Sequence, residues 1–237
     1  MTRLAGQIAL VTGASRGIGA ASAEALAAAG AHVVLTGRDT RLLEAVEQRI
    51  FDAGGSATIA PVDLADADGI ARLANAVAER WHKLDIMVHG AAVLPDLMAA
   101  KDIDQVAFSK ALTVNVLATQ ALLSRFDPLF KASDDPRLVY LTTSVATAPR
   151  AFWGAYAASK AAAEVLIDCH AQETRNISKL RVAIVDPGAT RTAMRAKAYP
   201  GEDPQSVKAP EVVAARVVSL LGEQFASPHR ERVNQSS

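Results

Sequence analysis

Short apolar runs rich in β-branched residues alternate along this 237-residue chain with longer segments rich in Ala, Leu and charged residues. The apolar runs are residues 7–12, 31–36, 56–64, 84–92, 137–144 and 180–188. The segments with helical composition are residues 18–30, 40–55, 67–81, 104–126, 155–173 and 211–222. Strands that alternate with helices in this way are typical of a parallel sheet covered by helices on both faces. We therefore predict an α/β fold with a single doubly wound domain over residues 1–237.

One stretch has the composition of neither a strand nor a helix. The sequence AYPGEDPQSVKAP, residues 198–210, contains three prolines and one glycine, which interrupt regular structure. We predict a loop over about 193–210 that covers a substrate site, with an inert surface loop as the alternative.

The amino-acid composition argues against two classes of partner, nucleic acids and membranes. Lys plus Arg and Asp plus Glu each number 25, so the charge pattern disfavours a nucleic-acid partner. No uncharged apolar run reaches about 18 residues, and the N-terminal residues lack the apolar core of a signal peptide, so we expect no membrane partner. Cys169 is the only cysteine; it fits a cytoplasmic location and is expected to be a small buried residue. We predict no metal site.

The glycine-rich sequence TGASRGIG, residues 12–19, joins the first predicted strand to the first predicted helix. At this position backbone N–H groups at a helix N-terminus can face a pyrophosphate. Gly13, Gly17 and Gly19 suit the turn, because glycine adopts positive φ and lets the backbone approach a ligand closely. The position favours a dinucleotide site over a purely structural turn.

A tyrosine and a lysine lie four residues apart in GAYAASK, residues 154–160. In a helix both side chains share one face, so the Lys160 ammonium can approach the Tyr156 phenol or a ligand beside it. A nearby cation favours the phenolate, and a fall of about 2 to 3 pKa units would let tyrosine act as acid or base near neutral pH. Ser144 offers a hydroxyl for a substrate oxygen beside that phenol.

Five motifs follow in order: TGASRGIG, VNVLA around Asn115, TTSVA around Ser144, AYAASK, and DPGATRT over 186–192. Over residues 7 to about 195 this set resembles the short-chain dehydrogenase/reductase family, and RAFWGAYAASK with TRTAMRAKAYPGEDPQ is similar to a poorly characterised bacterial branch of it. The resemblance implies a Rossmann fold and a catalytic tetrad. The tetrad residues are Asn115, Ser144, Tyr156 and Lys160.

The resemblance also implies a role for each residue. Asn115 holds a water that relays protons to Lys160, Ser144 polarises the substrate oxygen, and Thr143 is the alternative to Ser144. Tyr156 transfers the proton, while Lys160 holds the nicotinamide ribose and lowers the tyrosine pKa. The implied coenzyme contacts are Gly13, Ser15, Arg16, Gly17, Ile18, Gly19, Arg38, Asp63, Leu64, Ala91, Tyr156, Lys160, Pro187, Gly188, Thr190 and Thr192.

Two departures from the family pattern stand out. The usual Asn-Asn-Ala-Gly after the fourth strand is replaced by HGAA, residues 89–92, so we expect the side chain that braces the sheet to be missing and coenzyme affinity to suffer. His89 itself is expected to be a packed or partly solvated strand residue at the adenosine end of the cleft, and not a catalyst. The family's last strand is reduced to HRERVNQSS, residues 229–237, which makes assembly less certain than fold.

These expectations lead to an NADP(H)-dependent alcohol dehydrogenase or carbonyl reductase, in which Tyr156 exchanges the proton on oxygen. The alternatives are a 3-oxoacyl thioester reductase and a non-catalytic NADP(H)-sensing protein. Gly37 occupies the position where NAD-dependent members usually place a carboxylate, so Arg16 and Arg38 can bind the 2′-phosphate and NADP(H) is preferred over NAD(H). Asp39 is the complication, because a small shift would turn its carboxylate toward the ribose.

The partners are predicted to be a small carbonyl or alcohol substrate and further copies of the chain. The helices over 104–126 and 155–173 are long and apolar on more than one face, which predicts a homodimer or homotetramer. The candidates for an apolar substrate pocket are Leu94, Pro149, Phe152, Trp153 and Met194; each is equally plausible as a core residue.

Overall fold

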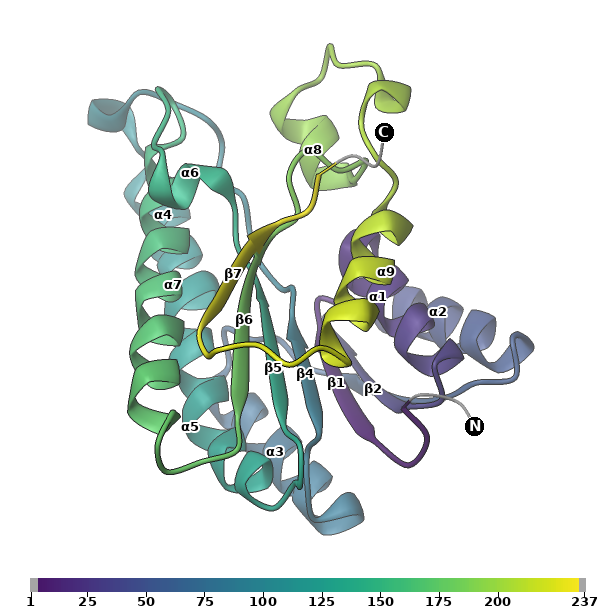
Figure 1. Ribbon diagram of the computed structural model, residues 1–237. Helices are drawn as coiled ribbons and strands as arrows, with labels where there is room; N and C mark the ends of the chain where they lie inside the picture. The colour runs from purple at the N-terminus through teal and green to yellow at the C-terminus, as the bar shows by residue number, and fades with distance from the viewer. Residues whose placement is uncertain (1–3, 235–237) are drawn as a thin grey trace.

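A single parallel sheet organises the protein, which is represented by a computed structural model that describes residues 4–234. Its seven strands lie in the order β3-β2-β1-β4-β5-β6-β7 (Figure 1). The strands are β1 (Ile8–Thr12), β2 (His32–Gly37), β3 (Ser56–Pro61), β4 (Ile86–His89), β5 (Arg137–Leu141), β6 (Arg181–Asp186) and β7 (His229–Arg232). The predicted doubly wound Rossmann fold is confirmed.

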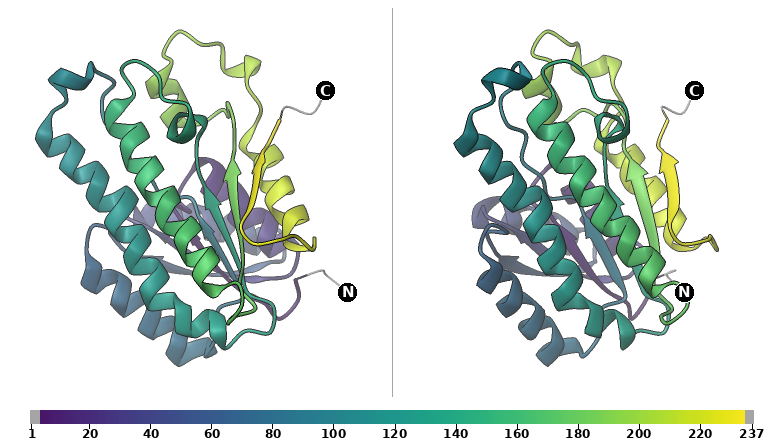
Figure 2. Two further views of the ribbon diagram at one scale, coloured as in Figure 1. Left: turned by 60° about the vertical axis from the view of Figure 1, so that its left-hand side comes forward. Right: turned by 90° about the vertical axis from the view of Figure 1, so that its left-hand side faces the viewer.

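Helices cover both faces of the sheet (Figure 2). On one face lie α1 (Gly17–Ala28), α2 (Thr40–Asp52) and α9 (Pro210–Leu221). On the other lie α3 (Ala67–Trp81), α5 (Ala118–Lys131) and α7 (Gly154–Thr174). The remaining short helices are η1 (Ala100–Asp102), α4 (Gln105–Leu112), α6 (Ser144–Thr147), α8 (Ala193–Ala198) and η3 (Pro204–Ser206).

The continuous apolar strands explain the two layers of helices. In β1, Ala9 and Val11 pack against the α1, α2 and α9 side, whereas Ile8 and Leu10 pack against the other side. Successive strand residues point to opposite faces, so a strand that is apolar throughout needs cover on both. Two hydrophobic cores result, separated by the sheet.

The helix predicted over 104–126 forms and extends over Gln105–Lys131, but one turn inside it is not α-helical. A π-helical turn, η2 (Thr113–Leu117), separates α4 from α5. A π turn inserts an extra residue into a helix and is frequent at functional sites; here it contains Asn115. The run Gln105–Lys131 is long and apolar enough to span a membrane by length and composition alone, with 39% of its most apolar stretch buried. Its contacts with α3 and α7 account for part of that apolar character.

The C-terminal end of the chain adds an edge strand. β7 pairs in parallel with β6 from Ala183↔His229 to Asp186↔Arg232, so the shortened last strand still forms; residues 235–237 of the predicted segment lie outside the described residues. Cys169 is exposed on α7, so the expectation that it is buried is wrong.

Candidate active site

A cleft of about 1000 Å³ lies at the carboxyl ends of the strands, on both sides of the switch point between β1 and β4. Open α/β sheets bind ligands at this place. Fourteen of the predicted site residues line it: Gly13, Ser15, Arg16, Gly17, Ile18, Gly19, Arg38, Asp63, Leu64, Ala91, Tyr156, Lys160, Pro187 and Thr192. The segments that supply them are separated by up to about 180 residues in the sequence and meet only in the folded protein.

The glycine loop forms the floor of the cleft under tight steric limits. A Cβ added to Gly13 would lie 2.9 Å from the Cα of Ala91, and one added to Gly19 would lie 2.1 Å from the carbonyl oxygen of Gly13. Gly13 also has φ +71°, which L side chains rarely adopt. The glycine loop therefore approaches both the Ala91 backbone and α1 more closely than a side chain at these two positions would permit.

The N-terminus of α1 is open toward the cleft. Its first residue, Gly17, follows Arg16, whose side chain makes no capping hydrogen bond, and the first turn contains no acidic residue. Unsatisfied N–H groups and the helix dipole at such an end favour an anion. The geometry therefore fits the phosphate groups of a dinucleotide.

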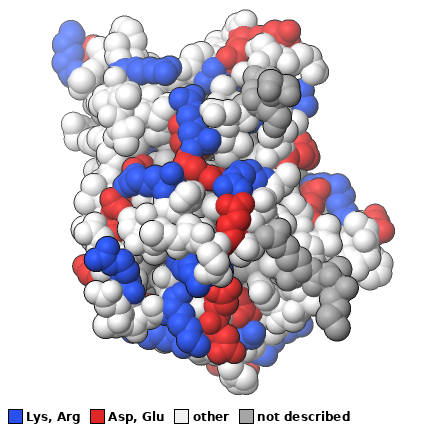
Figure 3. Space-filling model, in the orientation of Figure 1, with Lys and Arg blue, Asp and Glu red and all other residues white. Residues whose placement is uncertain are grey.

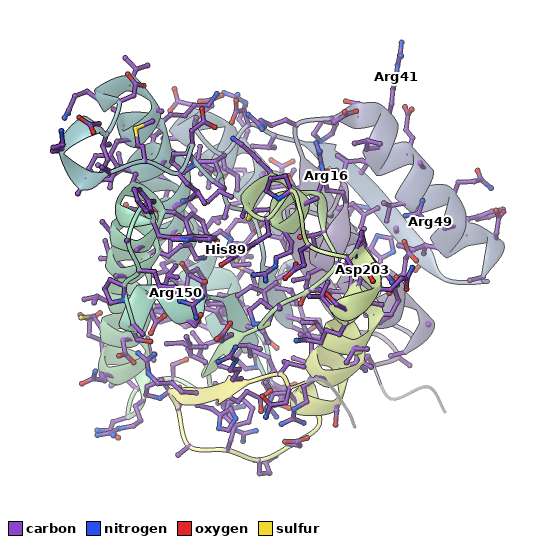
Figure 4. The ribbon with its side chains drawn as sticks, turned by 90° about the horizontal axis from the view of Figure 1, so that it is seen from above. Arg16, Arg41, Arg49, His89, Arg150 and Asp203 are labelled. Atoms are coloured by element: carbon purple, nitrogen blue, oxygen red, sulfur yellow. The ribbon has the colours of Figure 1, made fainter. Side chains whose placement is uncertain are left out.

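Exposed arginines mark one end of the cleft. Arg16 and Arg38 are both exposed and line it, and Gly37 ends β2 without a carboxylate. Asp39 accepts a hydrogen bond from the Leu42 N–H at 3.2 Å as the N-cap of α2. Figure 4 shows Arg41 extending away from the protein body, unlike Arg16. The Asp39 carboxylate is thus committed to a local structural bond.

Asn115 is buried and holds the neighbouring loop. Its Oδ1 accepts the Val93 N–H at 2.8 Å, and its Nδ2 donates to the Val93 carbonyl at 3.0 Å and to Ser159 Oγ at 2.9 Å. The Ser159 hydroxyl donates in turn to the Tyr156 carbonyl at 2.8 Å. Asn115 does not line the cleft; its side chain joins the loop after β4 to the helix that carries the tyrosine.

Tyr156 and Lys160 lie in the first two turns of α7 and are 8% and 3% exposed. The Lys160 Nζ donates to the Leu141 carbonyl at 2.7 Å and lies 4.1 Å from the centre of the Tyr140 ring. The Tyr156 hydroxyl points toward Met194 Sδ at 3.9 Å, a residue of α8. The pair thus occupies one wall of the cleft, opposite the segment after β6.

Burial dominates the electrostatics of this pair. It raises the pKa of Tyr156 to about 12, with the Asp186 carboxylate adding to the effect. It lowers the pKa of Lys160 to about 7, against the opposing influence of Glu164. The expected fall in the tyrosine pKa is therefore not found in this structure, because desolvation and the Asp186 charge both raise it.

Ser144 lies outside the lining of the cleft, whereas Tyr156 is part of it. Ser144 begins α6 and is partly exposed, and its hydroxyl makes no hydrogen bond to any residue in 4–234. Neither Ser144 nor Thr143 lines the cleft, whereas Thr142 does. Thr142 is a site residue that the sequence reasoning missed, although it lies in the same TTSVA motif.

The turn after β6 forms the wall opposite the tyrosine. Pro187 and Thr192 line the cleft, and Thr192 also caps α8 through a bond from the Arg195 N–H at 3.1 Å. Gly188 and Thr190 do not line it. The Thr190 hydroxyl donates to the Pro187 and Gly188 carbonyls, both at 3.2 Å, so these two residues shape the turn from within.

His89 supplies the brace that was expected to be missing. Its Nδ1 lies 2.6 Å from Thr12 Oγ1 and its Nε2 lies 2.9 Å from Thr119 Oγ1. Thr119 donates to the Asn115 carbonyl at 2.8 Å, and Thr12 accepts the Ala91 N–H at 3.1 Å. Because Thr119 has one proton and has already donated it, Nε2 carries the hydrogen and Nδ1 accepts one from Thr12.

The prediction that His89 lacks a bracing role is therefore wrong. The imidazole joins β1 to α5 and the coenzyme loop to the Asn115 turn, and it lies near the centre of the molecule (Figure 4). Complete burial, together with the Lys160 charge, lowers the pKa of His89 to about 3. The ring therefore stays neutral over the range in which proteins work.

The segment after Thr192 borders the cleft near Tyr156, where Ala193, Met194 and Lys197 line it. Lys197 forms an ion pair with Asp96 at 2.8 Å, and the Tyr199 ring lies 5.8 Å from the Trp153 ring. Leu94 and Met194 line the cleft. Pro149, Phe152 and Trp153 do not: Phe152 is 61% exposed, and Trp153 packs 6.1 Å from the Tyr156 ring.

Comparisons with known proteins agree with this architecture. The short chain dehydrogenase family matches residues 7–203. The chain is 37% identical over 220 residues to the uncharacterized oxidoreductase YciK of Escherichia coli K12, covering 92% of this chain and 86% of YciK. It is 32% identical over 238 residues to the 3-oxoacyl acyl-carrier-protein reductase of rhamnolipid biosynthesis in Pseudomonas aeruginosa, covering 92% and 90%.

A solved structure gives the same result. A short chain dehydrogenase from Escherichia coli CFT073, in complex with NADPH, superposes with a TM-score of 0.93 at 36% identity over 99% of both chains. This chain belongs to the short chain dehydrogenase family and is an oxidoreductase with a Rossmann fold.

Proposed function

We propose that the protein is an NADP(H)-dependent alcohol dehydrogenase or carbonyl reductase. The observation that carries the proposal is the convergence of the open N-terminus of α1 and the buried Tyr156–Lys160 pair on one cleft. A phosphate-binding end and a proton-transferring end in one continuous space suit a reaction between a dinucleotide and a small substrate.

The residues present fit NADP(H). Ser15, Gly17 and Ile18 would hold the phosphates at α1, Asp63 and Leu64 the adenine, and Ala91 the adjoining ribose. Lys160 would hold the nicotinamide ribose, and the Pro187–Thr192 turn the carboxamide. Arg16 and Arg38 would bind the 2′-phosphate through charge-assisted hydrogen bonds, giving a preference over NAD(H). The structural relative above binds NADPH, which supports this choice.

When bound, NADPH would supply a hydride to the carbonyl carbon. Tyr156 donates its phenolic proton to the carbonyl oxygen as negative charge develops there, and it takes a proton back in the reverse direction. The Lys160 ammonium stabilises the resulting phenolate, offsetting the burial that raises the pKa of the phenol. Asn115 fixes the helix and loop that position them, and Ser144 is assigned to orient the substrate oxygen.

A 3-oxoacyl thioester is the second candidate substrate. The Pseudomonas aeruginosa relative carries that activity in its name and covers nearly the whole chain. A non-catalytic NADP(H) sensor is the candidate from a different class. The test is a panel of aldehydes, ketones, quinones and 3-oxoacyl thioesters assayed with NADPH. NADPH binding without turnover of any carbonyl would leave the sensor and reject the enzyme.

The surface supports self-association. Val106, Leu117 and Val165 are 77%, 62% and 60% exposed on the helices that were predicted to pair, so an apolar face is left uncovered. We infer a homodimer or homotetramer through α4, α5 and α7. Light scattering at micromolar concentration tests it, and a monomer would reject it. A cytoplasmic location stays a prediction, open to cell fractionation.

A further inference from the structure

A buried carboxylate lies directly behind the lysine of the candidate site. Glu164 follows Lys160 by one helical turn in α7 and is only 5% exposed. Neither residue was linked to the other by the sequence motifs, although their i, i+4 spacing places both on one helix face. A carboxylate at this depth must be paired and hydrogen-bonded, because an isolated buried charge is costly.

Two donors from different strands satisfy Glu164. The Thr142 hydroxyl, at the end of β5, donates to its Oε2, and the Arg230 guanidinium, on β7, donates to its Oε1. Arg230 also donates to Asp168 Oδ2 at 2.6 Å, one turn further along α7. The edge strand at the C-terminal end of the chain is therefore tied by one arginine to the helix that carries the tyrosine and lysine.

This network reaches the lysine through the backbone as well. Lys160 Nζ donates to the carbonyl of Leu141, the residue that precedes Thr142. Thr142 in turn lines the cleft. Glu164 thus holds, through the threonine hydroxyl, the strand end that accepts the lysine hydrogen bond. Figure 3 shows charges of both signs side by side on the face that carries β7 in Figure 1. The Arg230 side chain is 44% exposed, so this chain of ion pairs begins at the surface.

We propose that Glu164, held by Arg230, is a positioning residue that keeps Lys160 charged and hydrogen-bonded to the Leu141 carbonyl at the wall of the cleft. The inference rests on the proposed function for its catalytic meaning. The electrostatic part of the inference concerns Lys160 alone. A buried ammonium needs a nearby negative charge, and the Glu164 carboxylate supplies it.

Among the groups near Lys160, Glu164 is the one that stabilises the ammonium. The titratable or charged groups around Lys160 are Tyr156 and Glu164 on α7, Tyr140 on β5, His89 on β4, Asp186 on β6 and Arg230 on β7. His89 is neutral and Arg230 repels the ammonium. Burial lowers the pKa of Lys160 to about 7, and Glu164 is the group that opposes this. Asp186 is instead engaged by the Gly188 N–H at 2.9 Å.

The titration of Lys160 can be measured directly, without substrate or coenzyme. The protein is labelled with lysine carrying ¹³C at Cε, and the signal that moves near pH 7 is assigned by its loss in Lys160→Met. In Glu164→Gln, which keeps the side-chain shape, we expect the Lys160 pKa to fall by about one unit, which lowers the ratio of ammonium to amine tenfold at any given pH. Asp168→Asn is the matched control, since it removes a charge from the same arginine at a point two turns from Lys160; it should shift that pKa by less than about 0.3 units.

A second variant keeps the test decisive if Glu164→Gln does not fold. Arg230→Gln leaves the carboxylate with one cation fewer, so we expect the Lys160 pKa to rise, opposite in sign to the first variant. A role limited to packing does not predict opposite signs. An unchanged Lys160 titration in either Glu164→Gln or Arg230→Gln, or an equal shift in Asp168→Asn, overturns the inference.

The two proposals fail separately. If the wild-type protein reduces no carbonyl yet the Lys160 titration follows the carboxylate, the proposed function is wrong and the electrostatic role of Glu164 stands. If carbonyls are reduced and the titration ignores Glu164, the reverse holds. Where turnover exists, the alkaline limb of the kcat/KM profile for reduction should move with the Lys160 titration in each variant.

Discussion

At the Arg16–Arg38 end of the cleft the charged side chains are exposed, and neither arginine has a partner among residues 4–234; at the Tyr156–Lys160 end the polar groups are buried and held. Exposed arginines keep their rotamer freedom and can adapt to an anion. Buried groups have fixed positions. Desolvation raises the pKa of Tyr156 to about 12 and lowers the pKa of Lys160 to about 7. We therefore expect coenzyme choice to depend on charge at the exposed end, whereas proton transfer at the buried end should depend on both charge and the exclusion of water.

The largest effect is expected at the buried end. Tyr156→Phe keeps the ring that packs against Trp153 and removes only the proton carrier. Carbonyl reduction should fall by about 10² to 10⁴, as for loss of a positioned general acid, while NADPH binding changes little. Steady-state kinetics and a fluorescence titration with NADPH measure the two quantities. Near-normal turnover in this variant would remove Tyr156 from the mechanism.

The next effect concerns the buried histidine and the stability of the fold. The pKa of His89 is lowered to about 3 in the folded protein, from an ordinary value near 6.5. Between these values the unfolded chain binds a proton that the native ring does not, so this contribution to stability is complete above pH 6.5 and is lost as the pH falls toward 3. At 1.36 kcal/mol per unit, the loss by pH 4 is about 3 kcal/mol.

His89→Asn removes that titration and retains hydrogen-bonding atoms. Urea unfolding at pH 7 and pH 4 should show the wild-type protein losing about 3 kcal/mol more than the variant between the two conditions. The comparison cancels the other titrating groups, which both proteins share. Equal losses would mean that the native ring accepts a proton and that its neutral bridge between Thr12 and Thr119 does not persist.

The two ends of the cleft also differ in how far the sequence predicted them. The glycine loop and the Arg16–Arg38 pair belong to one βαβ unit, so strand, turn and helix signals were sufficient to locate them. The supports of the buried end join separate units: Thr142 after β5 bonds Glu164 on α7, and Glu164 bonds Arg230 on β7, 66 residues away. Only the sheet order brings β5, β7 and α7 together. The i, i+4 spacing of Lys160 and Glu164 was the one signal available beforehand.

The predictions that were wrong or incomplete also concern features that the local sequence does not state. The brace at His89 was missed because it depends on Thr12 and Thr119, which are 77 and 30 residues away. The π turn at Asn115 was missed because an inserted residue leaves the apolar pattern of a helix almost unchanged. The direction of the Tyr156 pKa was missed because the sequence states the charge of Lys160 and says nothing of burial.

A smaller effect is expected at the exposed end. Arg38→Ala should lower kcat/KM with NADPH by about 10- to 150-fold, the range for one charge-assisted hydrogen bond of about 1.5 to 3 kcal/mol, with a much smaller change for NADH. Arg49→Ala is the matched control: the same charge is lost, but Arg49 lies on α2 in an ion pair with Glu24, outside the cleft. An unchanged coenzyme ratio in Arg38→Ala would assign the selection to another residue.

The smallest effect is expected at Asp39, the residue that follows Arg38. In the structure its carboxylate caps α2 through the Leu42 N–H, which leaves it turned to the helix. Asparagine caps helices about as well as aspartate, so Asp39→Asn should leave the melting temperature nearly unchanged, whereas Asp39→Ala should cost about 1 kcal/mol of stability. Removing the charge beside the expected 2′-phosphate should improve kcat/KM with NADPH by no more than about fivefold, because exposed charge pairs contribute roughly 0.2 to 1 kcal/mol. The NADH value should not change. A tenfold fall with NADH in Asp39→Asn would show instead that the carboxylate leaves the cap and faces the ribose, and that the exposed end selects its coenzyme by rearrangement as well as by charge.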